Sequence, residues 1–247
     1  MDYLIKVKGY SFLEAVETII GHTAIQAPVY ENPPPKEENK PLLLPEKCAS
    51  NRVITEYLFG RGIDFEIINY CISNDLIFES LPYHNVVFVG YDEKKEPKYA
   101  AYRSTNKRRI MGDCSGSKKD YSFRLGKENL EEVHLFECAI DLLSYATLAK
   151  LNGQDWKEMS FVSLSGVYSP AKKIEDSKVP IALEKYLGSN PSVRKIRIHF
   201  DNDIAGRKAA QTLKTILPDK YEIVDEPPKA GKDFNDFLCI RMGIYNK

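Results

Sequence analysis

The cysteines of this chain show neither of the patterns that usually give them a structural role. Cys48, Cys71, Cys114, Cys138 and Cys239 are odd in number, widely spaced, and never arranged as C-x-x-C. This pattern is typical of reduced cytosolic thiols rather than of disulfides or a zinc site. The sequence therefore predicts no zinc in this chain.

The sequence also lacks the long apolar runs that membranes require. No run approaches the roughly 20 residues needed to span a bilayer. Residues 1–12, MDYLIKVKGYSF, lack the basic start, apolar middle and small-residue end of a secretory signal. Hydrophobic residues make up 43% of the chain and charged residues 28%, as in ordinary soluble globular proteins. We therefore expect a cytoplasmic protein with no membrane partner.

The chain carries no net charge, because 35 Lys and Arg residues balance 35 Asp and Glu residues. A chain without net positive charge does not attract nucleic acid as a whole. Any binding of DNA or RNA must therefore depend on a local basic region. There are also no internal repeats. The 247 residues are enough for one large domain or two small ones, each with a core.

The first part of the chain predicts a helix and then a linker. In YSFLEAVETIIG, Ser11 and Glu14 have the spacing of a capping box, and apolar residues follow at helical spacing. Residues 27–46 contain six prolines around a charged middle, a composition that resists packing. We interpret residues 1–26 as a helical segment and residues 27–50 as a proline-rich linker.

The next segment, residues 51–126, predicts a smaller α+β domain. Two short helical stretches, 51–64 and 65–75, come first. The β-rich segments NVVFVGYD and PKYAAYRS follow, and the charged tetrapeptide EKKE between them predicts an antiparallel hairpin. YSFRL, at 121–125, is compatible with a further strand.

From residue 127 to 247 the pattern becomes an alternation of strands and helices. This order implies right-handed crossovers and a mainly parallel sheet flanked by helices, an α/β fold. Strands are expected at 133–136, 161–164, 195–200 and 221–224, and helices at about 138–150, 172–187 and 205–216.

Acidic side chains follow three of these four strands. Glu137 follows the first, Asp201 and Asp203 the third, and Asp233 the fourth, while Asp141 shares a helix face with Glu137. Ligands of parallel sheets bind beyond the carboxyl ends of the strands. Carboxylates crowded there would raise one another's pKa unless a cation lay among them, and oxygen ligands suit Mg²⁺.

Each of these acids also has a simpler interpretation. Asp203 is well placed to cap the helix that follows, Asp233 could cap the last helix, and Asp141 could be an exposed helical residue. Glu137 is harder to explain without a partner, because it follows the apolar stretch VHLF. Capping and cation binding both remain open for Asp203.

Four segments in this order resemble the Toprim domain. They are FECAIDLLSY, SLSGV, HFDNDIAGRKAA and GKDFNDFL, and the resemblance covers about residues 130–240. Bacterial DnaG-type primases, type IA and II topoisomerases and some nucleases share this domain. The resemblance implies a short, mainly parallel sheet of about four strands with helices on both faces.

The resemblance also implies roles for the acidic residues. Glu137, Asp201 and Asp203 would form the catalytic and metal-binding core, with Asp141 and Asp233 as outer metal ligands. The implied cofactor is Mg²⁺, with Mn²⁺ as a substitute.

Upstream, residues 51–125 resemble the domain that precedes Toprim in primase-like proteins of bacterial plasmids and conjugative elements. The segment VKGYSFLEAVETI is similar to the last helix of a primase zinc-binding domain, so residues 1–26 would be its helical remnant. The zinc ligands of such a domain would lie before Met1. We therefore expect either a truncated chain or a natural zinc-free version.

A local basic region lies just before the Toprim-like segment, with Tyr102 and Tyr121 close to it in sequence. It could follow a phosphate backbone while its aromatic residues stack on bases, or it could be a solvated loop. Lys232 could instead pair with Asp233 or Glu137. The candidate nucleic-acid ligands are Arg103, Lys107, Arg108, Arg109, Lys118 and Lys119, with Arg207 and Lys232 at the rim of the acidic site.

Together these features predict a Mg²⁺-dependent, primase-like protein that acts on DNA by nucleotidyl transfer, in replication or transfer of a mobile element. Its partners would be single-stranded DNA, nucleoside triphosphates, and a relaxase or helicase. A Toprim nuclease and a non-catalytic Mg²⁺- and DNA-binding module are the alternatives. A phosphoacceptor receiver domain fits less well, because it needs paired acids after the first strand and a single Asp after the third.

Overall fold

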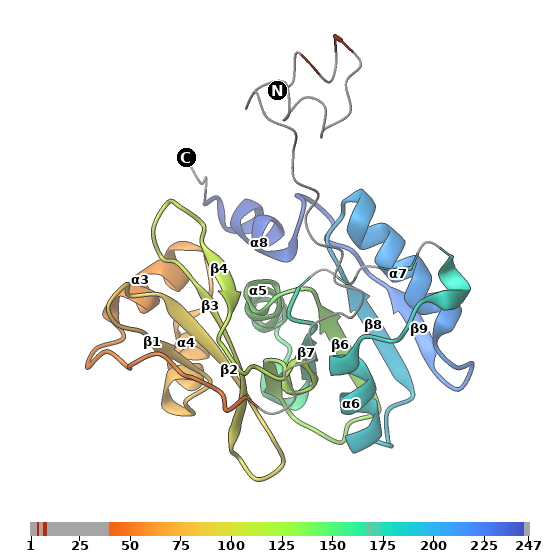
Figure 1. Cartoon of the computed structure of the whole chain (residues 1–247), viewed down its shortest axis with the longest axis horizontal. Coiled ribbons are helices and arrows are strands. Elements are labelled where there is room, and N and C mark those ends of the chain that lie inside the picture. The colour runs from red at the N-terminus through yellow and green to blue at the C-terminus, as the bar shows by residue number, and fades with distance from the viewer. Residues whose placement is uncertain are drawn as a thin grey trace, which may run out of the picture. The chain divides into compact units, whose positions relative to one another are not determined.

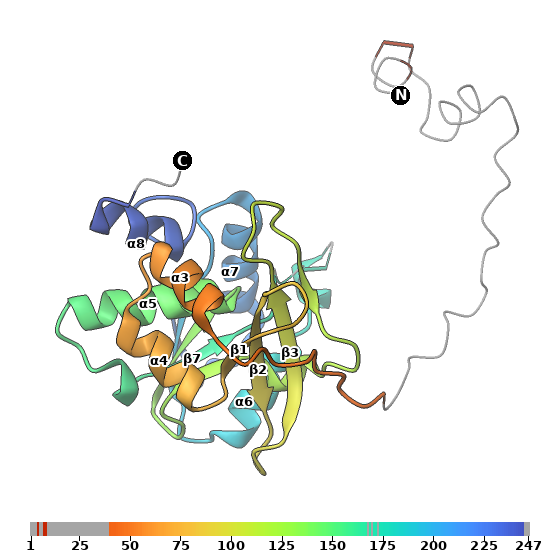
Figure 2. The ribbon, with the colours of Figure 1, turned by 90° about the vertical axis from the view of Figure 1, so that its left-hand side faces the viewer.

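The computed structural model describes residues 4, 7, 8 and 40–244, except 167, 169 and 172. The helix predicted within residues 1–26 and the linker up to residue 39 lie outside the described residues. From Lys40 onward the chain forms one compact unit. This unit contains two β-sheets, and helix α5 (Ala139–Leu151) lies between them (Figures 1 and 2).

The described end of the predicted linker, residues 40–50, is extended and bonded to the first sheet. The amide of Leu43 donates to the carbonyl of Ser115 at 2.9 Å, and the amide of Cys48 donates to that of Glu79 at 2.8 Å. These main-chain bonds fix this stretch along the fold, so it does not behave as a free linker.

Two short helices precede the first sheet, as the sequence predicts. They are α3 (Arg52–Gly60) and α4 (Phe65–Ser73). The carboxylate of Asp64 accepts a hydrogen bond from the amide of Glu66 and so caps α4. Apolar side chains of both helices, including Leu58 and Ile67, are buried in the core that they share with α5.

The first sheet is antiparallel, with the strand order β1-β2-β3-β4. Strands β2 and β3 form the predicted hairpin, with Val86 opposite Arg103. Residues of β2 alternate between faces, so that Phe88 packs toward α5 while Val87 packs on the other side. The strands are β1 (Ile77–Glu79), β2 (Val86–Tyr91), β3 (Pro97–Arg103) and β4 (Met111–Asp113).

The second sheet has five strands in the order β5-β7-β6-β8-β9, and all pairs except β5–β7 are parallel. The antiparallel edge strand β5 overlaps YSFRL, which the sequence pattern groups with the smaller domain. Antiparallel edges are common on otherwise parallel sheets. The sheet therefore has one strand more than the resemblance implies. The strands are β5 (Arg124–Gly126), β6 (Glu132–Phe136), β7 (Ser160–Ser163), β8 (Lys195–His199) and β9 (Glu222–Asp225).

Helices cover both faces of this sheet. Helices α5 and α8 (Phe234–Met242) pack on the face that carries Phe136. Helices α6 (Ile181–Ser189) and α7 (Ile204–Ile216) pack on the face that carries Val133 and Leu135. The predicted helix at 172–187 begins later than expected, at Ile181, because Pro180 directly before it lacks an N–H and cannot lie inside a helix.

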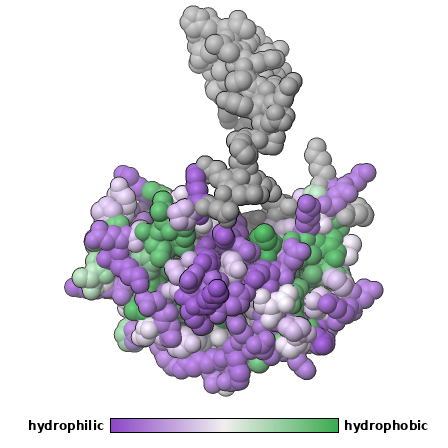
Figure 3. All heavy atoms as spheres, turned by 60° about the horizontal axis from the view of Figure 1, so that its bottom comes forward, coloured by the Kyte–Doolittle hydropathy of each residue, from purple (hydrophilic) through white to green (hydrophobic). Residues whose placement is uncertain are grey.

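Three short 3-10 helices complete the described elements: η1 (Lys119–Tyr121), η2 (Trp156–Glu158) and η3 (Ile174–Asp176). The face shown in Figure 3 is mostly hydrophilic, with its hydrophobic residues in smaller separate groups. Among the described residues, no helix is both long enough and apolar enough to cross a membrane.

The strand order creates a switch point between β6 and β8. From β6 the chain passes through α5 to β7 on one side, whereas β8 lies on the other side of β6. The connections that leave the carboxyl ends of β6 and β8 therefore diverge. Such divergence opens a crevice at that edge of a parallel sheet, where ligands characteristically bind.

We expect the core that the two sheets share around α5 to contribute strongly to stability. Phe161 of β7 is fully buried, so Phe161→Ala should lower the free energy of unfolding by about 3–5 kcal/mol through lost burial and the cavity left behind. Phe59→Ala is the matched control, since Phe59 is 61% exposed, and should change it by less than about 0.5 kcal/mol. Equilibrium urea unfolding measures both, and equal effects would contradict the assignment of this core.

Candidate functional site

Glu137 and Asp201 lie at the switch point, after β6 and β8 respectively. The Oε1 atom of Glu137 accepts a hydrogen bond from the backbone amide of Asp201 at 3.1 Å. The Glu137 side chain is buried, and its burial, reinforced by the charge of Asp201, raises its pKa to about 7. The two acids predicted from separate strands are therefore in direct contact.

Asp203 fulfils both interpretations that the sequence leaves open. Its Oδ1 atom accepts a hydrogen bond from the amide of Gly206 at 2.9 Å and so caps α7. Its Oδ2 atom faces the site, where it meets Lys232. The amide of Gly206 is the main reason that the pKa of Asp203 lies below its ordinary value. This carboxylate is thus held in its charged form beside the other acids.

Lys232 places a positive charge between two of the acids. Its Nζ atom lies 3.2 Å from Asp201 Oδ2 and 3.2 Å from Asp203 Oδ2. These contacts raise the pKa of Lys232. The pairing differs from the alternative suggested by the sequence, in which Lys232 would pair with Asp233 or Glu137. It also shows that the Asp201 and Asp203 oxygens converge on a point that suits a cation.

Asp141 is buried and Asp233 is half-buried close to this cluster, and both are engaged by local donors. Asp141 accepts from Cys138 Sγ at 2.8 Å and from the amide of Asn235 at 3.2 Å, and Asp233 accepts from the amide of Asp236 at 2.7 Å. Burial, followed by the charge of Asp233, raises the pKa of Asp141 above its ordinary value. Both acids belong to the cluster, and both also hold helix ends in place.

Gly206 is required by close packing at this site. A Cβ atom at this position would lie 2.2 Å from the Asp201 carbonyl oxygen and 2.9 Å from Glu137 Oε1. Atoms cannot approach the backbone that closely, so a side chain here would displace the loop that carries Asp201. The glycine in the segment DNDIAG thus allows the first turn of α7 to lie against both acids.

Arg207 is occupied by the end of β8. Its guanidinium donates to the carbonyl oxygens of Asp201 and Phe200, at 3.2 and 2.8 Å, and to Asp225 Oδ1 at 2.7 Å. The sequence pattern suggests Arg207 as a ligand for nucleic acid, but it does not reveal this network. The three bonds position the backbone of Asp201, and a role in binding DNA remains a prediction.

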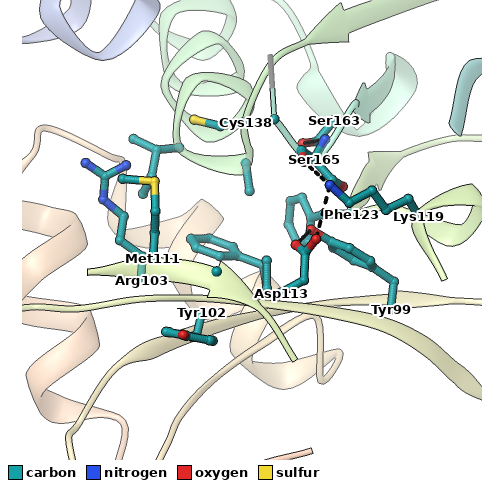
Figure 4. A pocket seen from close by; sticks show the side chains of 16 residues that line it. Tyr99, Tyr102, Arg103, Met111, Asp113, Lys119, Phe123, Cys138, Ser163 and Ser165 are labelled. Carbon is teal, nitrogen blue, oxygen red and sulfur yellow. Dashed lines mark hydrogen bonds and ion pairs between the residues drawn. The ribbon is translucent and has the colours of Figure 1, made fainter. Parts of the chain in front are cut away.

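A cavity of about 310 Å³ begins one residue from Glu137 (Figure 4). One wall is the face of β2, β3 and β4 that points toward α5, and the other is formed by the start of α5 and the segment after β7. The amide of Gly166 in that segment donates to the carbonyl of Glu137 at 2.9 Å. Lining residues include Phe88, Tyr99, Arg103, Met111, Lys119 and Phe123.

Two of the predicted basic residues, Arg103 and Lys119, line this cavity. Arg103 Nε donates to the Tyr57 hydroxyl at 3.0 Å. Lys119 Nζ lies 3.1 Å from Asp113 Oδ2 and donates to the Ser165 carbonyl at 3.3 Å. The structure therefore brings part of the predicted basic region to the edge of the acidic site.

The remaining basic residues stay outside the cavity. Three of them, Lys107, Arg108 and Arg109, occupy the connection between β3 and β4, and Lys118 directly precedes η1. All four are exposed, and in the part of the chain that the structure describes none of them takes part in an ion pair with an acid. They are accessible to a polyanion in solution, and their binding of nucleic acid remains a prediction.

Of the aromatic residues that line the cavity, the sequence indicates Tyr102 as one that could stack on bases, but it does not indicate Phe88, Tyr99 or Phe123. The signal that could have found them is the alternation along β3, which places Tyr99, Ala101 and Arg103 on one face. The opposite wall comes from residues at 138–140 and 163–166, which are distant in sequence. Their meeting depends on how the two sheets pack around α5.

Comparisons with known proteins agree with this fold. Residues 134–238 match a family model described as Toprim-like, and residues 56–129 match one described as a protein of unknown function (DUF3991). No curated protein matches the sequence.

Two solved structures share the fold. The primase fragment of the bacteriophage T7 primase-helicase protein is 18% identical, with a TM-score of 0.50, over 75% of this chain and 69% of that one. The DnaG catalytic core is 12% identical, with a TM-score of 0.50, over 76% of this chain and 68% of that one. The chain therefore contains a Toprim-like domain, within the fold of primase catalytic cores.

Proposed function

We propose that this protein is a Mg²⁺-dependent, primase-like nucleotidyltransferase that acts on single-stranded DNA. The observation that carries the proposal is the meeting of Glu137, Asp201 and Asp203 at the switch point, where Glu137 accepts from the Asp201 amide and one oxygen each of Asp201 and Asp203 lies 3.2 Å from the Lys232 ammonium. Carboxylate clusters of this kind suit phosphoryl transfer, in which charge must be neutralised and reactants aligned.

The residues present fit a divalent cation. Asp201 and Asp203 already share one ammonium, and Glu137, which accepts from the Asp201 amide, would supply a third oxygen. These three residues would hold Mg²⁺, or Mn²⁺ in its place, with Asp141 and Asp233 behind them. When bound, Mg²⁺ would neutralise phosphate charge and lower the pKa of an attacking hydroxyl.

In the proposed reaction the 3′ oxygen of one nucleotide forms a bond to the α-phosphorus of a nucleoside triphosphate. The bond from that phosphorus to the bridging oxygen breaks, and pyrophosphate leaves. The hydroxyl proton needs an acceptor, and the Glu137 carboxylate beside Asp201 is the candidate for this role. The network around Arg207 and Gly206 holds the neighbouring Asp201 in place.

The exposed basic residues support the binding of a DNA strand. Lys107, Arg108, Arg109 and Lys118 lie on the segment from residue 104 to 118, which leads from β3 to η1, while Arg103 and Lys119 border the cavity. Cations that contact phosphates give affinity that falls with rising salt. We further propose that the activity serves replication or transfer of a mobile element, together with a relaxase or helicase.

A second candidate function is a non-catalytic Mg²⁺- and DNA-binding module. The observation that favours it is the position of Lys232, whose ammonium by itself offsets the charges of Asp201 and Asp203. A metal would have to displace this ammonium. A nuclease would use the same cluster with water as the nucleophile, so the length of the products separates it from synthesis.

Template-directed nucleotide incorporation on single-stranded DNA with Mg²⁺ tests the proposal. We expect Glu137→Gln and Asp201→Asn each to lower the rate at least about 100-fold, since each removes a charge that faces the reacting groups. Asp219→Asn is the matched control, because Asp219 is an exposed acid in the turn after α7, and it should keep the wild-type rate.

Products shorter than the supplied strand would identify a nuclease instead. Wild-type protein that binds DNA and Mg²⁺ but forms no product would favour the non-catalytic module. Equal rates for all variants would contradict a catalytic role of the acidic cluster.

The raised pKa of Glu137 also predicts a pH dependence of stability in the metal-free protein. The folded state holds this proton more tightly than the unfolded state, whose glutamate has a pKa near 4.5. The resulting stabilisation is complete below about pH 4.5 and is lost as pH rises through about 7.

We therefore expect the free energy of unfolding in EDTA to fall by about 2–3 kcal/mol between about pH 5 and pH 8 on account of Glu137. Glu137→Gln keeps the acceptor for the Asp201 amide and should remove this part of the slope. Urea unfolding at several pH values measures it. Parallel curves for the two proteins would contradict the assigned pKa.

A further inference from the structure

We propose that Cys48, Glu79 and His84 form a binding site for a Zn²⁺ ion at the edge of the first sheet. One ligand atom from each of these residues lies within 4.8 Å of the other two. Thiolate, imidazole and carboxylate are the three kinds of side chain that bind zinc in proteins. The site goes beyond the proposed nucleotidyl transfer and does not depend on it.

Main-chain pairing places Cys48 beside Glu79. Lys47 pairs with Ser80 in an antiparallel bridge, and the amide of Cys48 donates to the Glu79 carbonyl at 2.8 Å. This register sets Cys48 opposite Glu79, and residues directly opposite each other in an antiparallel pair have their side chains on the same face. Glu79 ends β1, the outermost strand of the sheet. Two of the three ligands are therefore brought together by backbone hydrogen bonding.

Glu79 is 1% exposed, and helix α3 holds one of its two oxygens. The Oε2 atom accepts hydrogen bonds from the amides of Val53 and Ile54, at 2.8 and 3.2 Å. It thereby caps α3, to which Asn51 supplies no side-chain cap. The Oε1 atom lies 2.6 Å from Nδ1 of His84. Carboxylates that bind metals are commonly oriented by such hydrogen bonds, so Glu79 is prepared to offer Oε1 as a ligand.

His84 lies in the turn between β1 and β2, with its backbone in the left-handed region at a φ of 52°. This conformation is uncommon for residues other than glycine. The hydroxyl of Thr105 donates to the His84 carbonyl at 3.0 Å, and the amide of Ser80 donates to the carbonyl of Asn85 at 3.0 Å. These bonds fix the turn so that the ring lies beside Glu79. The His84 side chain is 46% exposed, so an ion can enter from solvent.

The thiol of Cys48 is available as the third ligand. Cys48 is half-buried and forms no disulfide, and its Sγ atom has no hydrogen-bond partner among the residues that the structure describes. A tetrahedral Zn²⁺ has bonds of about 2.0–2.3 Å, which set its ligand atoms about 3.3–3.6 Å apart. The contact between Glu79 and His84 would have to widen, and the proton shared there would leave as the ion enters.

The mixed ligand set favours zinc over the hard cations. Mg²⁺ and Ca²⁺ take oxygen ligands, whereas a thiolate and an imidazole suit Zn²⁺. A water molecule would complete the four ligands. The bound ion would tie residues 40–50 to β1 and, through Glu79, to the start of α3. The expectation of no zinc rests on the missing C-x-x-C spacing, and it does not consider ligands from three separate segments.

Titration of the full chain with Co²⁺ and then Zn²⁺ tests the proposal. A reductant keeps the thiols reduced, and excess Mg²⁺ competes for the carboxylate oxygens of the acidic cluster without occupying a thiolate. Co²⁺ serves as the probe because a cobalt–thiolate bond absorbs in the near ultraviolet and so reports a sulfur ligand. We expect wild-type protein to take up one Co²⁺ with this absorption and to lose the absorption when Zn²⁺ displaces it.

Two ligand variants and one matched control locate the ion. Cys48→Ser should abolish the absorption and weaken Zn²⁺ binding at least about 100-fold, since losing a group that only supports a ligand already costs about 10- to 100-fold. His84→Asn should weaken binding as much, and asparagine tolerates the left-handed backbone of this position. Cys114→Ser is the control, because Cys114 is a half-buried free thiol directly after β4, and it should keep wild-type binding.

Thermal unfolding checks that each variant folds, and His84→Asn tests the same site if Cys48→Ser does not fold. Zn²⁺ should raise the melting temperature of wild-type protein but not that of Cys48→Ser. Wild-type protein without the cobalt–thiolate absorption would overturn the proposal and leave Glu79 and His84 as a simple pair that caps α3. An absorption kept in Cys48→Ser but lost in Cys138→Ser would also overturn it, because Cys138 contacts Asp141 at the acidic cluster.

Discussion

Repulsion among carboxylates at the ends of β6 and β8 is the constraint on which the rest of the site depends. Glu137 is buried against Asp201, and its pKa of about 7 reflects both burial and that neighbouring charge. Three neighbouring donors offset part of the repulsion among these carboxylates. They are the amides of Asp201 and Gly206 and the ammonium of Lys232. Each donor reduces the repulsion only in part. A divalent cation that enters such a site would offset the remaining repulsion and so stabilise it.

The sheet topology and the acidic core can be predicted from the sequence because they depend on local patterns. Alternating strands and helices imply a parallel sheet, and in such a sheet the residues that follow neighbouring strands meet at one edge. Strand order alone therefore predicts that Glu137, Asp201 and Asp203 lie together. The match of the Toprim-like model to residues 134–238 confirms the identity of this domain. Where a proline intervenes, as at Pro180, the helix begins several residues later than the pattern predicts.

Other features cannot be predicted in this way because they depend on packing between distant segments. The pairing of Lys232 with Asp201 and Asp203 requires the loop before α8 to return to β8. Arginine is a residue type that often binds DNA, but three acceptors within this protein occupy the guanidinium of Arg207. The cavity beside Glu137 exists only because α5 lies between two sheets. Periodicity assigns residues to faces of a strand, but it does not say which surface lies opposite.

The edge strand β5 has a consequence for any attempt to divide this chain. Leu125 of β5 pairs with Phe161 of β7, and every residue of β7 is buried. A fragment that began at residue 127, where the strand–helix alternation starts, would lack β5. Strand β7 would then become an open edge with unpaired amides and carbonyls and an apolar surface. Such edges recruit strands from other molecules. The three residues of β5 thus protect the second sheet from self-association, although they are contributed by the segment before it.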